Sequence, residues 1–99
     1  MASSVIKNYK PMQALTGTTG AVGAGVSLAY PSGFTMNNSV IIGLQFKNPS
    51  ENLWRTMGMV NENIACAISA IMTPTEILVV PRNSMAENSQ FKVSLYRYQ

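Results

Sequence analysis

The chain of 99 residues is long enough for one small hydrophobic core and too short for two domains. Hydrophobic residues make up 46% of it and charged residues only 11%, whereas an average globular protein carries roughly 25% charged residues. Such low charge is typical of an extracellular surface protein, or of a domain that hides much of its exterior in an oligomer. Histidine and aspartate are absent and Cys66 is the single cysteine, which excludes a Ser-His-Asp triad, a Cys-His pair and a Cys/His zinc cluster within one chain.

The first residues predict an extended arm, 1–11, within a single β-sandwich domain that spans residues 1–99. The opening MASSVIKNYK has no apolar h-region, so no signal peptide is expected. No apolar stretch approaches the roughly 18 residues of a membrane span. The net charge of +3 comes from single, scattered lysines and arginines, whereas nucleic-acid binders concentrate positive charge on one face. We therefore expect neither membrane insertion nor a nucleic-acid partner.

The glycine-rich stretch GAVGAGVS, residues 20–27, resembles a phosphate-binding loop in its spacing but has Val26 at the lysine position. Such a loop needs that lysine and a helix behind it, and here the glycines lead straight into VSLAYPSG, a strand that ends in a turn. These glycines instead predict bulges or close strand packing. Nucleotide binding is not expected.

Apolar and polar side chains alternate with a period of two, which is typical of β-strands. In VIIGLQF, the alternation predicts Val40, Ile42, Leu44 and Phe46 on one face and Ile41, Gly43 and Gln45 on the other. Seven short strands with turn residues between them predict an all-β, antiparallel, jelly-roll-like sandwich. The strands are expected near 12–18, 21–30, 39–47, 53–60, 63–72, 76–81 and 90–98.

The segment NENIACAISAIM, within 61–72, is the ambiguous element, because its alanines tolerate a helix while its apolar residues also alternate. In a strand, Cys66 is expected to be a buried, unreactive thiol. At the other end of the chain, FKVSLYRY predicts Phe91, Val93 and Leu95 inward, with Tyr96 and Tyr98 outward.

Two segments, VIIGL and ILVV, are apolar on both faces, which implies burial on both sides. A sandwich covers only one face of each sheet, so a further copy of the chain is one candidate to cover the other. The alternative is a loop that covers a central strand in a monomer. The candidate oligomer contacts are Ile41, Leu78, Val80, Tyr96 and Tyr98.

The only side-chain carboxylates are those of Glu51, Glu62, Glu76 and Glu87. A glycosidase needs two carboxylates on either side of one bond, and a calcium site several oxygen ligands. Each glutamate lies in or beside an expected turn or strand end, where solvated glutamates are ordinary. No catalytic residue, metal or cofactor is expected.

Aromatic residues near turns are the remaining candidates for binding, because a ring offers a flat apolar platform with a polar handle. Trp54 follows the turn KNPSEN, and its alternative role is that of a core anchor. The candidate ligand-binding residues are Trp54, Arg55, Tyr30 and Asn52.

The order of SGFTMNNSVIIGLQF, the Trp54 segment, TPTEILVV and a closing FKVSLYRY resembles the small C-terminal β-sandwich domains of phage tail-fibre and baseplate proteins, especially from phages of Gram-positive bacteria. The resemblance covers about Met12 to Gln99 and rests on strand order and composition. It implies a non-enzymatic virion protein, extracellular in action, that binds a bacterial cell-surface saccharide or protein as a homotrimer. A purely structural virion module without a cell-surface ligand, and an enzyme acting on glycans, are the alternatives.

Overall fold

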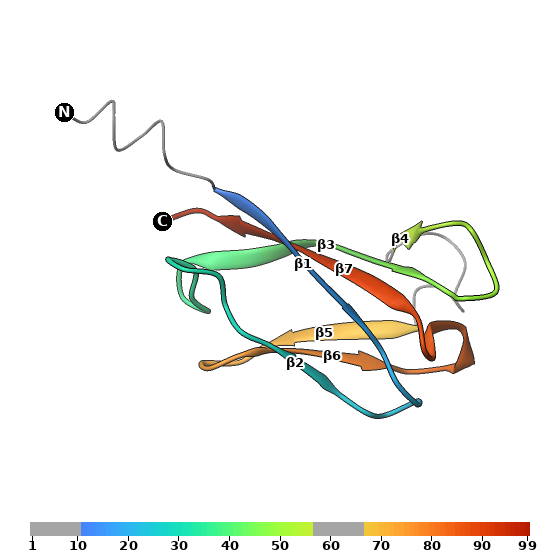
Figure 1. Ribbon diagram of the computed structural model, residues 1–99. Helices are drawn as coiled ribbons and strands as arrows, with labels where there is room; N and C mark the ends of the chain where they lie inside the picture. Colours follow the sequence, from blue (N-terminus) through green and yellow to red (C-terminus); the bar gives the residue numbers. More distant parts are fainter. Residues whose placement is uncertain (1–10, 57–66) are drawn as a thin grey trace.

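The computed structural model describes residues 11–56 and 67–99, and it is a two-layer β-sandwich (Figure 1). Its elements are β1 (Met12–Thr18), β2 (Val26–Leu28), β3 (Ser39–Lys47), β4 (Arg55–Thr56), β5 (Ile68–Met72), β6 (Ile77–Pro81), a 3₁₀ turn η1 (Ser84–Ala86) and β7 (Gln90–Arg97). One sheet has the order β1-β7-β3-β4 and the other β2-β6-β5, with every pairing antiparallel. The predicted all-β sandwich is confirmed.

The chain crosses between the two sheets more than once, and its outer strands pair in a nested way. The first strand pairs with the last, β1 with β7, and the second pairs with the sixth, β2 with β6. This nesting brings the two ends of the described chain together at one end of the four-stranded sheet, where Arg97 N donates to Pro11 O at 2.7 Å. The opposite end of that sheet carries the turn between β3 and β4.

The bounds of β1, β3, β6 and β7 agree closely with the expected ranges, whereas the expected strands 53–60 and 63–72 are described only as Arg55–Thr56 and Ile68–Met72. The second strand runs over 26–28 and not over 21–30, because residues 21–25 form a loop. In that loop Gly23 has a φ of 87°, a conformation that favours glycine, and its N–H donates to Pro81 O at 2.9 Å. The ambiguous segment is a strand over 68–72; Cys66 lies outside the described residues, as do residues 1–10 and 57–65.

The core lies between the sheets and is aliphatic and aromatic. Phe91, Val93 and Leu95 on β7 are fully buried, as the alternation of FKVSLYRY predicts. They pack with Phe46 of β3 and with the inward side chains of β6. Because β7 lies between β1 and β3, its inward side chains are flanked by those of both neighbouring strands and are covered by the opposite sheet.

A β-bulge in β3 changes which residues face the core. The register shifts between Ile41 and Gly43, so Ile41 packs against the core while Ile42 and Val40 are exposed. The prediction that Val40 and Ile42 share the inward face of Leu44 and Phe46 is therefore wrong. Strict alternation fails at a bulge because one extra residue reverses the side of every residue before it.

Two loops close the sandwich at the end where β3 meets β4. Thr19 N donates to Ser89 O at 2.8 Å, Ser89 N donates back to Thr19 Oγ1 at 2.9 Å, and Thr19 Oγ1 donates to Ala86 O. Asn88 N donates to Gly20 O at 3.1 Å, with Asn88 in the left-handed region at a φ of 51°. These bonds join residues 19–20 to residues 86–89 and hold Asn88 at the rim of the four-stranded sheet.

Within the described ranges, no helix is long and apolar enough to cross a membrane.

Candidate functional site

The outer face of the four-stranded sheet has an apolar half and a polar half. Near the chain ends, Met12, Tyr96 and Val40 lie opposite one another across three strands, and all three are exposed. At the other end, the rows directly across the same strands are polar: Thr16, Lys92 and Gln45 in one row, and Thr18, Gln90 and Lys47 in the next. The polar half adjoins the turn that leads to Trp54.

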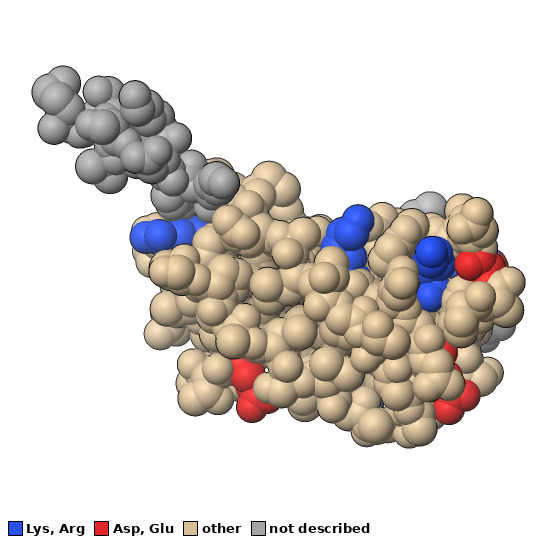
Figure 2. Space-filling model, in the orientation of Figure 1, with Lys and Arg blue, Asp and Glu red and all other residues tan. Residues whose placement is uncertain are grey.

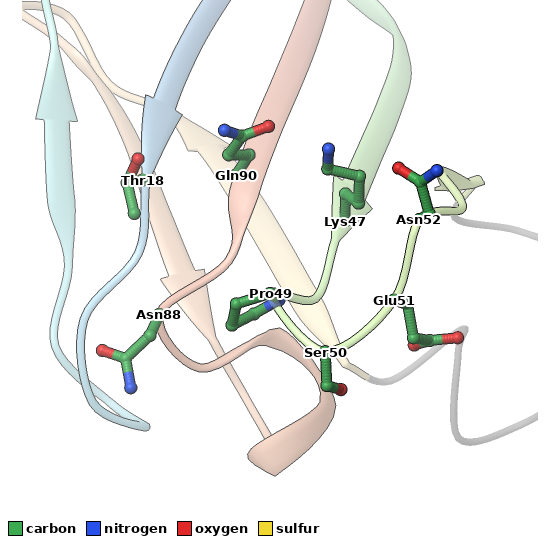
Figure 3. Close-up of a pocket in the computed structure, with 8 residues that line it drawn as sticks. All are labelled: Thr18, Lys47, Pro49, Ser50, Glu51, Asn52, Asn88 and Gln90. Carbon is green, nitrogen blue, oxygen red and sulfur yellow. The ribbon is translucent and has the colours of Figure 1, made fainter.

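This polar half is hollowed. A cavity of about 580 Å³ lies between the sheet and the β3–β4 turn (Figure 3), and its lining residues are Thr18, Lys47, Pro49, Ser50, Glu51, Asn52, Asn88 and Gln90. A second depression of about 330 Å³ is lined by Thr16, Gly17, Thr18, Trp54, Gln90, Phe91 and Lys92. The two adjoin, because both are lined by Thr18 and Gln90, and together they are called here the Trp54 groove.

Asn48 shapes the turn that forms one wall of the Trp54 groove. Its Oδ1 accepts hydrogen bonds from the N–H of Ser50 at 2.9 Å and from the Ser50 hydroxyl at 2.6 Å. Its Nδ2 donates to Met85 O at 2.8 Å, which ties the turn to the chain just before β7. Asn is favoured in such turns because its short side chain can bond the backbone two residues ahead. The turn therefore presents residues 49–52 to the groove in a defined conformation.

Glu51 and Arg55 form an ion pair beside the groove. The Arg55 guanidinium donates from Nε to Glu51 Oε1 at 3.2 Å and from Nη2 to Glu51 Oε2. These hydrogen bonds hold the pKa of Glu51 below its usual value and raise that of Arg55. Glu51, the one carboxylate among the described lining residues of the groove, is thus neutralised by its own neighbour.

Trp54 lies against two lysines that point out of the sheet. The Lys92 ammonium nitrogen is 4.9 Å from the centroid of the Trp54 ring, and the Lys47 nitrogen is 5.9 Å from it. Both distances fall in the range of a cation–π contact, which contributes about 0.5–1 kcal/mol at an exposed site. Since β3 and β7 are adjacent strands, their two lysines reach the same ring. The Trp54 residue remains 36% exposed.

Several polar side chains of the groove have no partner within the part of the chain that the structure describes. Neither lysine ammonium forms an ion pair or hydrogen bond there, and the side chains of Thr18, Asn52, Asn88 and Gln90 form none either. In Figure 3 the Lys47 and Gln90 side chains rise from neighbouring strands on the same side, with Asn52 facing them from the turn. The groove therefore offers amide, hydroxyl and ammonium groups together with one aromatic ring.

The structure brings three of the four expected ligand-binding residues together. Trp54 and Asn52 line the groove, and Arg55 lies beside it with its guanidinium bound to Glu51. Trp54 is not a core anchor, because the ring lies on the outer face of the sheet.

Tyr30 lies elsewhere. Its hydroxyl donates to Thr73 O at 2.6 Å, in the turn between β5 and β6, at the end of the sandwich opposite β4 (Figure 1). Burial raises the pKa of Tyr30, whose ring packs against the core. It does not belong to the Trp54 groove.

Sequence reasoning missed the groove residues that come from strands, namely Thr18, Lys47, Gln90 and Lys92, along with Asn88 of a turn. The outward direction of the strand residues follows from the alternation of inward and outward side chains, as it does for Lys92. What the sequence lacks is any sign that β1 and β3 both flank β7, which alone places these side chains in one depression.

The candidate oligomer contacts are dispersed. Tyr96 and Tyr98 are exposed on or beside β7, whereas Ile41 packs against the core because of the bulge. Val80 is only 6% exposed, and Leu78 is half-buried against Gly25, where a Cβ would lie 2.8 Å from Leu78 Cδ1. Ile41 and Val80 therefore offer little surface to a partner, and the close packing at Gly25 agrees with the expected role of these glycines.

The described carboxylates are engaged separately. Glu51 pairs with Arg55, Glu76 accepts a hydrogen bond from the Ser27 hydroxyl, and Glu87 Oε2 accepts one from Val22 N at 3.1 Å. Glu62 lies outside the described residues. Across residues 11–56 and 67–99, no three of the residues that commonly hold metals are grouped together.

Comparison of the chain with family models, with curated proteins and with solved structures finds no match.

Proposed function

We propose that this protein is a non-enzymatic adhesion domain, a fibre-tip or baseplate component of a phage, that binds a saccharide of the bacterial cell surface in the Trp54 groove as part of a homotrimer. The single observation that carries the saccharide proposal is the exposed indole of Trp54 set beside amide and hydroxyl side chains without partners among the described residues. Sugars present an apolar ring face and many hydroxyl groups, which an aromatic platform and polar hydrogen-bonding groups complement.

The groove is shallow and open, so the affinity of one copy for one sugar unit is expected to be weak. A homotrimer overcomes this weakness because three linked sites bind a repeating polymer with higher avidity than one. The exposed apolar residues Met12, Val40, Ile42 and Tyr96 support a contact between copies at the opposite half of the same sheet. That half lies away from the groove, so assembly leaves the groove accessible.

The proposal is tested by labelling cells and cell-wall preparations with the purified, fluorescently tagged protein. We expect the wild-type protein to bind the polysaccharide fraction of a susceptible bacterium, and Trp54→Ala to lose at least about tenfold in apparent affinity with an unchanged oligomeric mass. Tyr30→Phe serves as the matched control, since it alters an aromatic residue outside the groove. Equal binding by wild type and Trp54→Ala contradicts the site, and absence of binding to any wall fraction leaves the structural virion module as the better account.

A further inference from the structure

We infer that the saccharide bound in the Trp54 groove is anionic, carrying phosphate or carboxylate groups along its chain. This inference rests on the proposed function and adds the chemical class of the ligand. The observation behind it is the charge that the fold gathers around one ring.

Lys47 and Lys92 belong to different strands, and they become neighbours only because β3 pairs with β7. The carboxylate in the groove, that of Glu51, is neutralised by the forked hydrogen bonds of Arg55. Among the described residues, the groove therefore keeps two positive charges without a counter-charge. In Figure 2 the blue atoms of this view lie above the four-stranded sheet, while red atoms occupy the lower side and the right-hand end.

The contact with Trp54 also limits where the two ammonium groups can go. Each lysine carries three N–H donors and no acceptor, and none of these donors is taken by another described residue. Packing on the indole keeps both long side chains from spreading into solvent. An anionic group that enters beside the ring would meet two donors already held close to it, whereas a neutral sugar would leave both charges without a counter-charge.

A nucleic acid would also satisfy two positive charges and an aromatic ring. Proteins that bind single strands stack successive bases on several aromatic side chains along a basic groove. The described lining of this groove contains one exposed aromatic ring, and its other members are mainly hydroxyl and amide side chains. The lining therefore favours a sugar polymer over a nucleic acid.

The test is a titration of the full chain by ¹⁵N NMR with four probes. Oligogalacturonate carries carboxylates, its methyl ester has the same backbone without charge, glycerol phosphate oligomers carry phosphodiesters, and a deoxythymidine decamer represents single-stranded DNA. We expect at least one anionic sugar or polyol probe to bind about tenfold more tightly than the neutral ester, with shifts at the Trp54 indole N–H. Raising the salt to 0.5 M should reduce that difference, because the screening length falls well below its value of about 8 Å at physiological salt.

Two substitutions test whether Lys47 and Lys92 cause the preference for an anionic ligand. Lys92→Gln and Lys47→Gln should each weaken binding of the anionic probe about three- to tenfold, and should weaken binding of the methyl ester by a clearly smaller factor. Arg82→Gln is the matched control: it removes the same charge from the chain, but Arg82 lies beside the three-stranded sheet, where Nε donates to Ser69 Oγ at 2.9 Å. Arg82→Gln should change neither affinity by more than about twofold.

The outcomes separate this inference from the function beneath it. Equal binding of the acid and its ester, with no effect of either lysine substitution, overturns the anionic ligand and leaves a saccharide site standing. If the deoxythymidine decamer is the only probe that binds, the proposal of a saccharide ligand is wrong. Absence of shifts at Trp54 with every probe, in a protein that still labels cell walls, shows that the proposed site itself is misplaced. Preference for carboxylate or for phosphodiester identifies the anionic group.

Discussion

The ring of Phe91 lies directly against Gly17, the residue opposite it on β1. A Cβ built on Gly17 would lie 2.5 Å from Phe91 Cζ and 2.9 Å from Cε2, closer than real side chains approach. Phe91 is fully buried, so the ring cannot move aside into solvent. Glycine at position 17 is therefore required for the packing of the last strand, and both residues line the Trp54 groove.

Gly17→Ala should lower the free energy of unfolding by about 1–3 kcal/mol, because the added methyl group forces the Phe91 ring or β1 to shift. Urea denaturation measures the change. Gly20→Ala is the control: nothing lies within 4 Å of its Cβ position, so its effect should stay within about 0.5 kcal/mol. Equal stability of the two variants would show that Phe91 has room to yield.

Asn48 and Asn52 lie four residues apart and are expected to behave oppositely. Asn48→Ala removes the hydrogen bonds to Ser50 and Met85 and should cost about 1–2 kcal/mol of folding stability. Asn52→Ala should leave the melting temperature unchanged, since its side chain bonds no other described residue, but should weaken saccharide binding. Calorimetry and an NMR titration measure the two effects, and a fall in stability for Asn52→Ala contradicts the assignment.

The Glu51–Arg55 pair makes part of the stability depend on pH in the acid range. The pKa of Glu51 lies below its usual value of 4.5 in the folded protein, so the pair's contribution is fully present above about pH 4.5 and is lost as the pH falls through the lower folded pKa. The difference in melting temperature between wild type and Glu51→Gln should be constant from about pH 7 to 5 and shrink at lower pH. The other carboxylates cancel, because both proteins carry them. A difference that grows on acidification would contradict the pairing.

Tyr30 is expected to support the fold and not the ligand. Tyr30→Phe removes the hydrogen bond to Thr73 O and should cost about 0.5–1.5 kcal/mol of unfolding free energy, with unchanged saccharide binding. Tyr98→Phe is the comparison, because its hydroxyl donates to Asn37 O at 3.1 Å in an exposed position and should contribute less. Loss of binding in Tyr30→Phe would restore this residue to the binding site.

The proposed contact between copies uses the apolar half of the four-stranded sheet. Ile42→Lys should convert the trimer to a monomer at micromolar concentration, since a charge buried in an apolar contact is unfavourable. Ile71→Lys is the matched control on the outer face of the other sheet, where Ile71 is 43% exposed against 51% for Ile42. The mass of each protein in solution is the measurement. If Ile71→Lys alone dissociates the oligomer, the contact lies on the three-stranded sheet, and if the wild type is a monomer, the proposal of a trimer is wrong.

The sequence predicts local structure well where one rule governs each residue. The alternation of Phe91, Val93 and Leu95 against Lys92 places β7 correctly, because a strand between two layers must bury every second side chain. The same rule fails in β3, where the bulge between Ile41 and Gly43 reverses the faces. A bulge depends on the partner strand, which a pattern within one segment does not contain.

The candidate site shows the same division. Trp54 and Asn52 stand in a turn with clear sequence signals, and the sequence identifies both. The sequence also placed Tyr30 among the ligand-binding residues, and this prediction fails. An aromatic residue near a turn looks similar in sequence whether its ring packs inward or outward, and only the contact of Tyr30 with Thr73 in the structure shows that this ring packs inward.

The sequence by itself determined that this protein is an all-strand sandwich without the residue types for a triad or a zinc cluster, because alternation and composition are properties of the chain alone. Only the tertiary structure decided that Lys47, Lys92 and Trp54 share one groove. These residues are brought together by the pairing of β3 with β7, in a register set by burial of the inner face, although Lys47 and Lys92 are 45 residues apart in the sequence. Long-range pairing of this kind is an outcome of packing the whole core, and no short segment encodes it.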